Sequence, residues 1–453
     1  MRKKGLRCVI AVMVAVVVGI CSAGCAGKEK TFPTYGTDKS FYIAGWGSPY
    51  AAEEDYRLAK EAGINHFLVV EAYSPSGTFI PTDLLELNKG AGITTVMHTN
   101  NDYGKAVDGK LSLHDTDYKD FSEYIDRICY CDEPVYSNFS TLKEWAKAHD
   151  EKYGDEFTFY VNLMGSYMRT EEMGDTAETQ NYDHFVDEFC SQVLSEIKTG
   201  KRVLSCDMYP FSRRNGRVSI LTGWLYTLEK LMYSAKENGA VHEEFIQVTE
   251  HLTNPKATEE SIRYQAYVLL NFEVSGLTYF TYSSPFEDYK NSCVNLNKSQ
   301  SLNDEYYYVK TVNSELRAFE NIYLNYSVDG VMPVYGTEND YDVDENGEVI
   351  GNPLMRMMRR SLKSVDKVKS ITATEDTLVS DMTDKDGNKA YLITNFSNPY
   401  DGNSDVVDIT FDKKAKYTRL AVFRKGERKV YEVKDNKFTL ELESGEGVFV
   451  MPA

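Results

Sequence analysis

The sequence predicts a (β/α)8 barrel followed by a small antiparallel β-sandwich, and three observations support this fold class. Within residues 41–327, eight short apolar runs alternate with amphipathic helical patterns. The runs are continuous rather than alternating, as in parallel strands that helices cover. Beyond residue 327 the helical patterns largely give way to short strand patterns with Asn-Gly and Asp-Gly turns, which are typical of antiparallel sheets.

The eight predicted barrel strands are separated by segments long enough for a helix. They are residues 41–46, 66–72, 94–99, 127–133, 157–163, 202–209, 244–250 and 277–283. A doubly wound open sheet is the competing fold, and it would place a GxGxxG phosphate loop after the first strand. The sequence there is "GWGSPY", which lacks that spacing, so we favour the barrel.

Helix start and stop signals support the alternation of strands and helices. Thr141 and Glu144 have the spacing of a capping box. Thr258 precedes a helix that we expect to run to Gly276, and the pattern "WLYTLEKLMYSAKENG" ends at Gly239.

The predicted sandwich covers residues 328–453. Its strands are joined by turn signals at Asn346-Gly347 and Asp386-Gly387. The spacing of Asp342, Asp344 and Asn346 resembles the start of a calcium loop, but Pro353 stands where that loop needs a Glu. We therefore expect a plain hairpin, and we predict no metal site.

The N-terminus has the features of an export signal. Basic residues precede the apolar run "CVIAVMVAVVVGI" and the sequence "SAGC", which ends at Cys25. This resembles a bacterial lipoprotein signal. The resemblance implies that residues 1–24 are removed, that Cys25 is lipidated, and that residues 25–40 tether the protein to the extracytoplasmic face of the membrane. An ordinary secretory signal cleaved nearby is the alternative.

Charge and cysteine content exclude several classes of protein. The formal net charge of -19 argues against nucleic acid as a partner. Of eight cysteines, five lie beyond Cys25, an odd number that does not suggest a disulfide framework. No CxxC pair or His cluster suggests zinc, and no cofactor motif is found. Contact with a membrane is expected through the lipid anchor only.

Polar and aromatic residues stand at the ends of the predicted strands. In a barrel these ends converge on one face, where active sites lie. Carboxylates, amides and aromatic rings together favour a polyhydroxylated ligand such as an oligo- or polysaccharide. The candidate residues are Trp46, Glu71, His98, Asn100, Asp132, Glu133, Asn162, Asp207, Tyr209, Gln247, Glu250 and Tyr282.

Several of these motifs resemble clan A glycoside hydrolases, in particular the galactosidase-like bacterial members. Asp132-Glu133-Pro134 is similar to the strand-four motif of that clan, with Asp132 in place of the usual Asn. "CDMYPF", "GLTYFTYSSP" and the terminal "GEGVFV" add to the resemblance. It implies that Glu133 is the acid/base and Glu250 the nucleophile of a retaining glycoside hydrolase, with Phe280 or Tyr282 as the strand-eight aromatic residue.

The chemistry requires two carboxyl groups, one to protonate the leaving oxygen and one to attack or to activate water. In retaining enzymes the pair is about 5–5.5 Å apart, so we expect Glu133 and Glu250 to be close. Glu71 and Asp207 are the reserve carboxylates.

Two alternatives remain open at this point. A non-catalytic, surface-anchored glycan-binding lipoprotein would use the same aromatic funnel, although it would not need the pair of carboxylates. A metal-dependent barrel hydrolase could use Glu71, His98, Asp207 and His251. Only seven His are present, scattered along the chain, and no paired ligand motif stands out.

Overall fold

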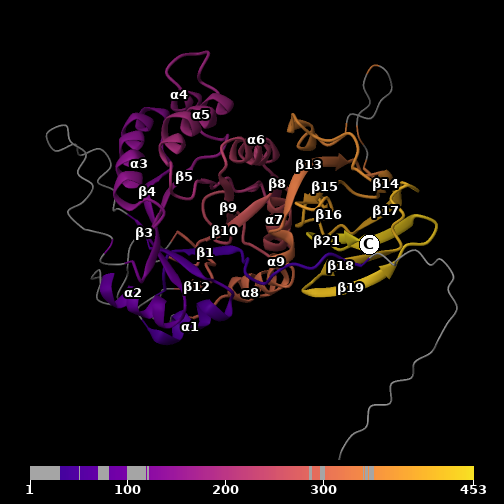
Figure 1. Ribbon diagram of the computed structural model, residues 1–453, viewed down its shortest axis with the longest axis horizontal. Coiled ribbons are helices and arrows are strands. Elements are labelled where there is room, and N and C mark those ends of the chain that lie inside the picture. Colours follow the sequence, from indigo (N-terminus) through magenta and orange to yellow (C-terminus); the bar gives the residue numbers. More distant parts are fainter. Residues whose placement is uncertain are drawn as a thin grey trace, which may run out of the picture. The chain divides into compact units, whose positions relative to one another are not determined.

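Eight parallel strands close into the barrel that the sequence predicts (Figure 1). Their order around the barrel is β1-β10-β9-β6-β5-β4-β3-β2. The strands are β1 Tyr42–Trp46, β2 His66–Val69, β3 Thr94–His98, β4 Ile125–Asp132, β5 Thr158–Leu163, β6 Val203–Cys206, β9 Val241–Gln247 and β10 Val274–Phe280.

The computed structural model describes most of the chain beyond the N-terminal signal. The described residues are 31–49, 52–69, 81–98, 119, 122–284, 288–295, 301–339, 341, 345 and 351–453. Cys25, Glu71, Asn100 and the Asn346-Gly347 turn lie outside them. Among the described residues, no helix is long and apolar enough to cross a membrane.

The last two barrel strands begin and end three residues earlier than the sequence suggests. They were expected at 244–250 and 277–283 and are found at Val241–Gln247 and Val274–Phe280. The apolar runs start late because β9 opens with charged residues that are buried through pairing. His242 Nε2 lies 2.8 Å from a carboxylate oxygen of Glu244, so these polar side chains occupy strand positions. Glu250 and Tyr282 consequently lie beyond the strand ends.

A buried ion pair crosses the barrel interior between β4 and β9. Arg127 donates to both carboxylate oxygens of Glu243, at 2.5 and 2.9 Å. The guanidinium also lies over the Tyr42 ring, 3.5 Å from its centroid. On β10, a Cβ at Gly276 would be only 2.7 Å from the Glu243 carboxyl carbon. Glycine at position 276 therefore makes room for the charged pair.

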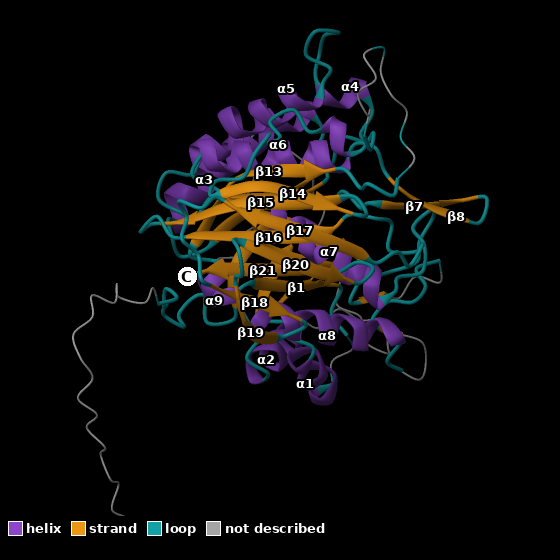
Figure 2. Cartoon of the chain, turned by 90° about the vertical axis from the view of Figure 1, so that its right-hand side faces the viewer, coloured by secondary structure: helices purple, strands orange, loops and turns teal. Residues whose placement is uncertain are grey.

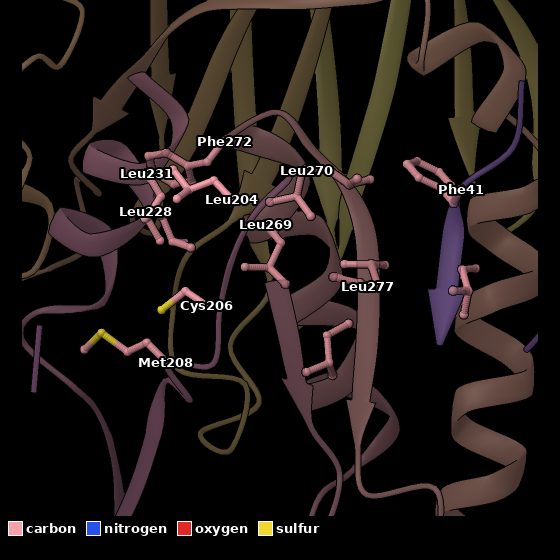
Figure 3. Packing of buried hydrophobic residues seen from close by; sticks show 14 of the residues in the cluster. Phe41, Leu204, Cys206, Met208, Leu228, Leu231, Leu269, Leu270, Phe272 and Leu277 are labelled. Atoms are coloured by element: carbon pink, nitrogen blue, oxygen red, sulfur yellow. The ribbon is translucent and has the colours of Figure 1, made fainter. Parts of the chain in front are cut away.

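The helices cover the barrel and bury their apolar faces against its strands. Figure 3 shows Leu228 and Leu231 beside Leu204, and Leu269 near Leu277. The helices are α1 Glu53–Glu61, α2 Pro81–Gly90, α3 Phe139–Tyr153, α4 Thr170–Met173, α5 Tyr182–Glu188, α6 Trp224–Glu237, α7 Glu259–Asn271, α8 Asp304–Arg317 and α9 Glu320–Tyr323.

Two helix boundaries differ from the sequence-based expectation. Thr258 caps α7, because its hydroxyl accepts from the Ser261 backbone N–H at 3.1 Å, but the helix ends at Asn271 rather than Gly276. Thr141 lies inside α3, so the expected capping box does not form there. The chain already turns at Tyr136–Asn138, where the Asn138 side chain accepts from the Val135 N–H.

Two antiparallel sheets follow the barrel and face each other, as predicted (Figure 2). The six-stranded sheet consists of β13 Tyr326–Val334, β15 Thr377–Asp384, β16 Lys389–Asn395, β21 Gly447–Pro452, β18 Arg419–Arg424 and β19 Glu427–Glu432. The three-stranded sheet consists of β14 Val368–Ala373, β17 Asp405–Phe411 and β20 Lys437–Leu442. Short strands outside these sheets are β7 Phe211–Arg214, β8 Arg217–Ile220, β11 Ser283–Ser284 and β12 Val294–Asn295.

The predicted Asp386-Gly387 turn joins β15 to β16. Gly387 has a φ of +81°, which favours glycine. Its N–H donates to the Asp384 carbonyl at 3.1 Å, and the Asp384 carboxylate accepts from the Asp386 and Asn388 N–H groups. This hairpin is confirmed.

The six-stranded sheet also contacts the barrel helices. Asn271 at the end of α7 donates to the Thr394 hydroxyl at 2.7 Å and accepts from the Ser380 hydroxyl at 2.5 Å. Phe319 stacks on Phe449 with 5.6 Å between ring centroids. Residues Phe32–Ala453 form one compact unit, and the division into domains at residue 327 stays a prediction.

Replacing Glu243 by Gln should lower the free energy of unfolding by about 3–5 kcal/mol, because buried Arg127 would lose its hydrogen-bonded counter-ion and keep only the longer contact with Asp126, at 3.8 Å. Urea denaturation followed by circular dichroism measures this loss. The matched control is Glu123→Gln, which breaks an exposed pair with Lys89 and should have a much smaller effect on stability. Similar losses in the two variants would contradict the assigned importance of the buried pair.

Candidate active site

Three carboxylates gather where β4 and β6 end. Asp132 is the last residue of β4, Glu133 follows it directly, and Asp207 follows β6. We call Asp132, Glu133 and Asp207 the carboxylate cluster. Such a position, at the C-terminal ends of barrel strands, is where (β/α)8 proteins carry their catalytic groups.

The backbone at Glu133 is in an unusual conformation. Its φ is +50°, which is uncommon for a residue other than glycine. Its N–H donates to the Asn162 carbonyl at 2.9 Å, so the neighbouring strand β5 fixes this turn. The side chain is exposed, whereas that of Asp132 is half-buried. Backbone strain of this kind clusters at functional sites.

Asp207 is the most buried carboxylate of the cluster, only 9% exposed. Its Oδ1 atom is buried and has no hydrogen-bond partner among the described residues. Burial raises the pKa of Asp207 well above its ordinary value, and the charges of Glu133 and Asp132 raise it further. This carboxyl group is therefore suited to hold a proton near neutral pH.

The pKa of Asp132 is also shifted by its surroundings. Burial raises its pKa to about 7, with a further increase from Glu133 and an opposing effect of the hydrogen bond from Asn162. Burial and neighbouring charges thus raise the pKa values of both Asp132 and Asp207, which is typical of sites built for proton transfer.

A chain of hydrogen bonds inside the barrel holds Asp132 in place. Asn162 Nδ2 donates to Asp132 Oδ1 at 3.1 Å, and Asn162 Oδ1 accepts from the Ser205 hydroxyl at 3.1 Å. Ser205 in turn lies 2.8 Å from the Tyr160 hydroxyl. Asn162 thus presents its NH2 group to Asp132 and its oxygen to Ser205.

Tyr167 is a site residue that the strand-end reasoning missed. Its hydroxyl donates to Glu133 Oε1 at 2.8 Å, from the loop that follows β5. Burial raises the pKa of Tyr167, and the nearby charges of Asp207 and Glu133 raise it further, so the phenol stays a donor. A tyrosine in "MGSYM", five residues beyond Asn162, was the available signal in the sequence.

Aromatic rings line the space beside the carboxylate cluster. Phe280 at the end of β10 lies 6.2 Å from Trp46, 5.3 Å from Tyr209 and 5.8 Å from Tyr289, between ring centroids. Burial raises the pKa of Tyr209, and the charge of Asp207 adds to the shift, which places Tyr209 next to the cluster. Phe280 is therefore the strand-eight aromatic residue near the site.

Glu250 lies apart from the end of β9, in the loop that follows. It accepts from Arg213 Nη2 at 2.7 Å and from Asn291 Nδ2 at 2.9 Å. Its backbone pairs with that of Lys290. Arg213 and Asn291 thus contact both of its carboxylate oxygens, one each.

Three other predicted site residues are buried. Gln247 is fully buried and donates to the Pro255 carbonyl at 2.6 Å, while Tyr282 is fully buried against Phe67. Their side chains offer no surface to a ligand in this conformation. His98 is 6% exposed, and burial lowers its pKa to about 4, so it is neutral.

Within the stretches that the structure describes, no group of three or more His, Cys, Asp or Glu side chains has an arrangement that could hold a metal ion. His251, a member of the alternative metal set, stacks on Tyr289 with 3.9 Å between ring centroids. Glu71, another member, lies outside the described residues.

No protein-family model and no curated sequence matches this chain. Solved structures with a similar fold include a GH27 β-L-arabinopyranosidase from Geobacillus stearothermophilus, at 10% identity and a TM-score of 0.48 over 92% of this chain and 97% of that one. A 4-O-α-L-rhamnosyl-β-D-glucuronidase from Fusarium oxysporum matches at 10% identity and a TM-score of 0.44, over 93% and 99%. At such distances these similarities say nothing about the activity of this chain.

The raised pKa of Asp132 implies that the stability of the folded protein depends on pH. The folded state keeps this proton up to about pH 7, whereas the unfolded state releases it near the ordinary value of 3.8. The contribution of Asp132 to the free energy of unfolding should therefore fall as the pH rises from 4 to 7. Asp132→Asn removes this dependence.

Urea denaturation of both proteins between pH 4 and 8.5 measures this difference. The variant should gain stability relative to wild type as the pH rises, with a plateau above pH 7. Asp155→Asn, at an exposed position, serves as the control and should show a flat difference. A flat difference for Asp132→Asn would show that Asp132 ionises as an ordinary carboxylate.

Proposed function

We propose that this protein is a glycoside hydrolase whose two reacting carboxyl groups are Glu133 and Asp207. The observation that carries the proposal is the carboxylate cluster at the strand ends, in which the charge of Glu133 raises the pKa of the buried Asp207. Glycoside hydrolysis requires such a pair, with one member protonated and the other ionised. A protein that only binds glycans has no need of it.

Asp207 is suited to the role of general acid. Its raised pKa keeps a proton on the carboxyl group, which can be given to the oxygen of the departing sugar or aglycone. Glu133 is suited to the role of the second carboxyl group, because it is exposed and its position is fixed by a hydrogen bond from Tyr167. It would attack the anomeric carbon or activate a water molecule.

This assignment differs from the one that the family resemblance implies. There Glu133 is the acid/base and Glu250 the nucleophile. The polar contacts of Glu250 with Arg213 and Asn291 favour a structural role in its loop instead. Retention of anomeric configuration stays a prediction, which proton NMR of the first product would check.

The aromatic rings of Trp46, Tyr209, Phe280 and Tyr289 support a sugar substrate, because their apolar faces suit sugar C–H surfaces and the Trp and Tyr side chains add hydrogen-bonding groups. We further propose that the enzyme acts on an oligo- or polysaccharide at the extracytoplasmic face, anchored by a lipid on Cys25. Labelling with a fatty-acid analogue tests the anchor separately from the activity.

A screen of aryl and natural glycosides of both anomeric configurations should identify a hydrolysed substrate. On that substrate Glu133→Gln and Asp207→Asn should each lower kcat/KM at least a hundredfold, in line with general acid-base effects of about 10²–10⁴. Asp207→Asn should lose more on substrates with poor leaving groups than on activated aryl glycosides, which need less protonation.

Glu250→Gln is the matched control and should stay within about threefold of wild type if its role is structural. A large loss in Glu250→Gln together with an active Asp207→Asn would restore the pair implied by the family resemblance. Sugar binding without any turnover would instead support the glycan-binding alternative.

A further inference from the structure

One edge of the six-stranded sheet has a charge opposite to that of the chain. Residues 412–437, which include β18 and β19, contain ten Lys or Arg and four Asp or Glu, whereas the chain has a formal net charge of -19. This stretch therefore carries +6, and the rest of the chain carries -25. Charge asymmetry of this size indicates an anionic partner for the basic part.

The basic residues are brought together by the fold. β19 is the edge strand, and all six of its residues are exposed (Figure 2). The Val433 N–H donates to the Thr418 carbonyl at 2.8 Å, and the Phe411 N–H donates to the Asn436 carbonyl at 2.7 Å. The connections before β18 and after β19 therefore lie side by side. We call residues 412–419 and 427–437 the basic edge.

Several lysines of the basic edge are available to an external partner. Among the described residues, five of them have no ion-pair or hydrogen-bond partner for the ammonium group: Lys413, Lys414, Lys416, Lys434 and Lys437. Charged side chains, lysines above all, also protect an edge strand from pairing with another chain. These five lysines, however, lie before β18 and after β19, not on the edge strand itself. The positive sign in an acidic protein needs a further reason.

The basic edge also exposes large apolar side chains. Val430 is 48% exposed and Tyr431 is 38% exposed, both on β19. Apolar and aromatic groups beside basic ones are the combination found on surfaces that lie at a membrane interface.

The N-terminal tether reaches the same edge. The Phe32 ring lies 5.1 Å from the Arg428 guanidinium and 5.6 Å from that of Arg419. Three residues later, the Tyr35 hydroxyl lies 2.8 Å from both the Tyr326 hydroxyl and an Asp384 carboxylate oxygen. The tether is thus held on this sheet from Phe32 onward.

Phe32 is only seven residues beyond Cys25. A fully extended chain spans at most about 3.3–3.6 Å per residue, so these residues reach about 25 Å. A lipid on Cys25 would therefore hold the basic edge within about 25 Å of the bilayer.

We propose that the basic edge lies against an anionic bilayer surface and orients the anchored protein there. The lysines are attracted to acidic headgroups, and Val430 meets the interfacial region. This surface acts independently of the proposed glycosidase activity, and it rests on the lipidation of Cys25.

The test uses the full-length lipidated protein, purified from membranes and reconstituted in vesicles. A fluorophore on Val430→Cys reports contact with a headgroup-linked nitroxide quencher, and the five described cysteines are buried and resist labelling. Quenching should be at least threefold stronger in phosphatidylglycerol-containing vesicles than in phosphatidylcholine alone. It should fall in high salt, which screens exposed charges. Val406→Cys, 37% exposed on β17, is the control position and should be quenched weakly in both lipids.

Charge-reversal variants test which lysines hold the basic edge against the anionic bilayer. Lys434→Glu with Lys437→Glu should reduce quenching at position 430 to the level found in phosphatidylcholine. The matched pair Lys369→Glu and Lys385→Glu, at exposed positions outside the basic edge, should leave it unchanged. Equal quenching at positions 430 and 406, equal quenching in both lipids, or absence of the protein from the membrane fraction would each overturn the proposal.

Discussion

The buried ion pair between Arg127 and Glu243 is the constraint on which the barrel interior depends. Both side chains are 3% exposed, and they join β4 to β9 across the interior. A lone buried charge would be strongly destabilising, so each residue requires the other. The residues around the pair accommodate it, since Gly276 leaves room for Glu243 and the Tyr42 ring lies against the guanidinium.

The same strand that carries Arg127 ends in the carboxylate cluster. β4 therefore has a charged residue near its start, Arg127, that pairs with Glu243, and its end carries two members of the carboxylate cluster. Asn162 and Tyr167 hold Asp132 and Glu133 from the β5 side, and Asp207 comes from β6. Grouping like charges with few counter-ions destabilises the folded state, and it yields carboxyl groups with raised pKa values.

The sequence predicts the barrel and the sandwich because continuous apolar runs and turn signals are local patterns. It places the last two strands three residues late. At β9 the reason is that charged residues are buried through pairing, Glu243 with Arg127 of β4 and Glu244 with His242. Because the predicted strand ran to residue 250, Glu250 was expected at its end, whereas β9 ends at Gln247.

Asp132, Glu133, Asp207 and Tyr209 were predictable as neighbours because they stand at the ends of apolar runs. Tyr167 was not, since a loop residue is brought to Glu133 only by the folded path after β5. The burial of Gln247 and Tyr282 could not be read from the sequence either, because it depends on contacts with the Pro255 loop and Phe67.

The central claim is that Asp207 and Glu133 form one coupled pair, and titration of 13C-labelled Asp carboxyl groups by NMR tests it most directly. The signal that disappears in Asp207→Asn should titrate well above an ordinary aspartate. Its pKa should fall in Glu133→Gln, which removes a neighbouring charge, and should stay the same in Glu250→Gln. An ordinary pKa for Asp207, or one that responds to Glu250 and not to Glu133, would contradict this account.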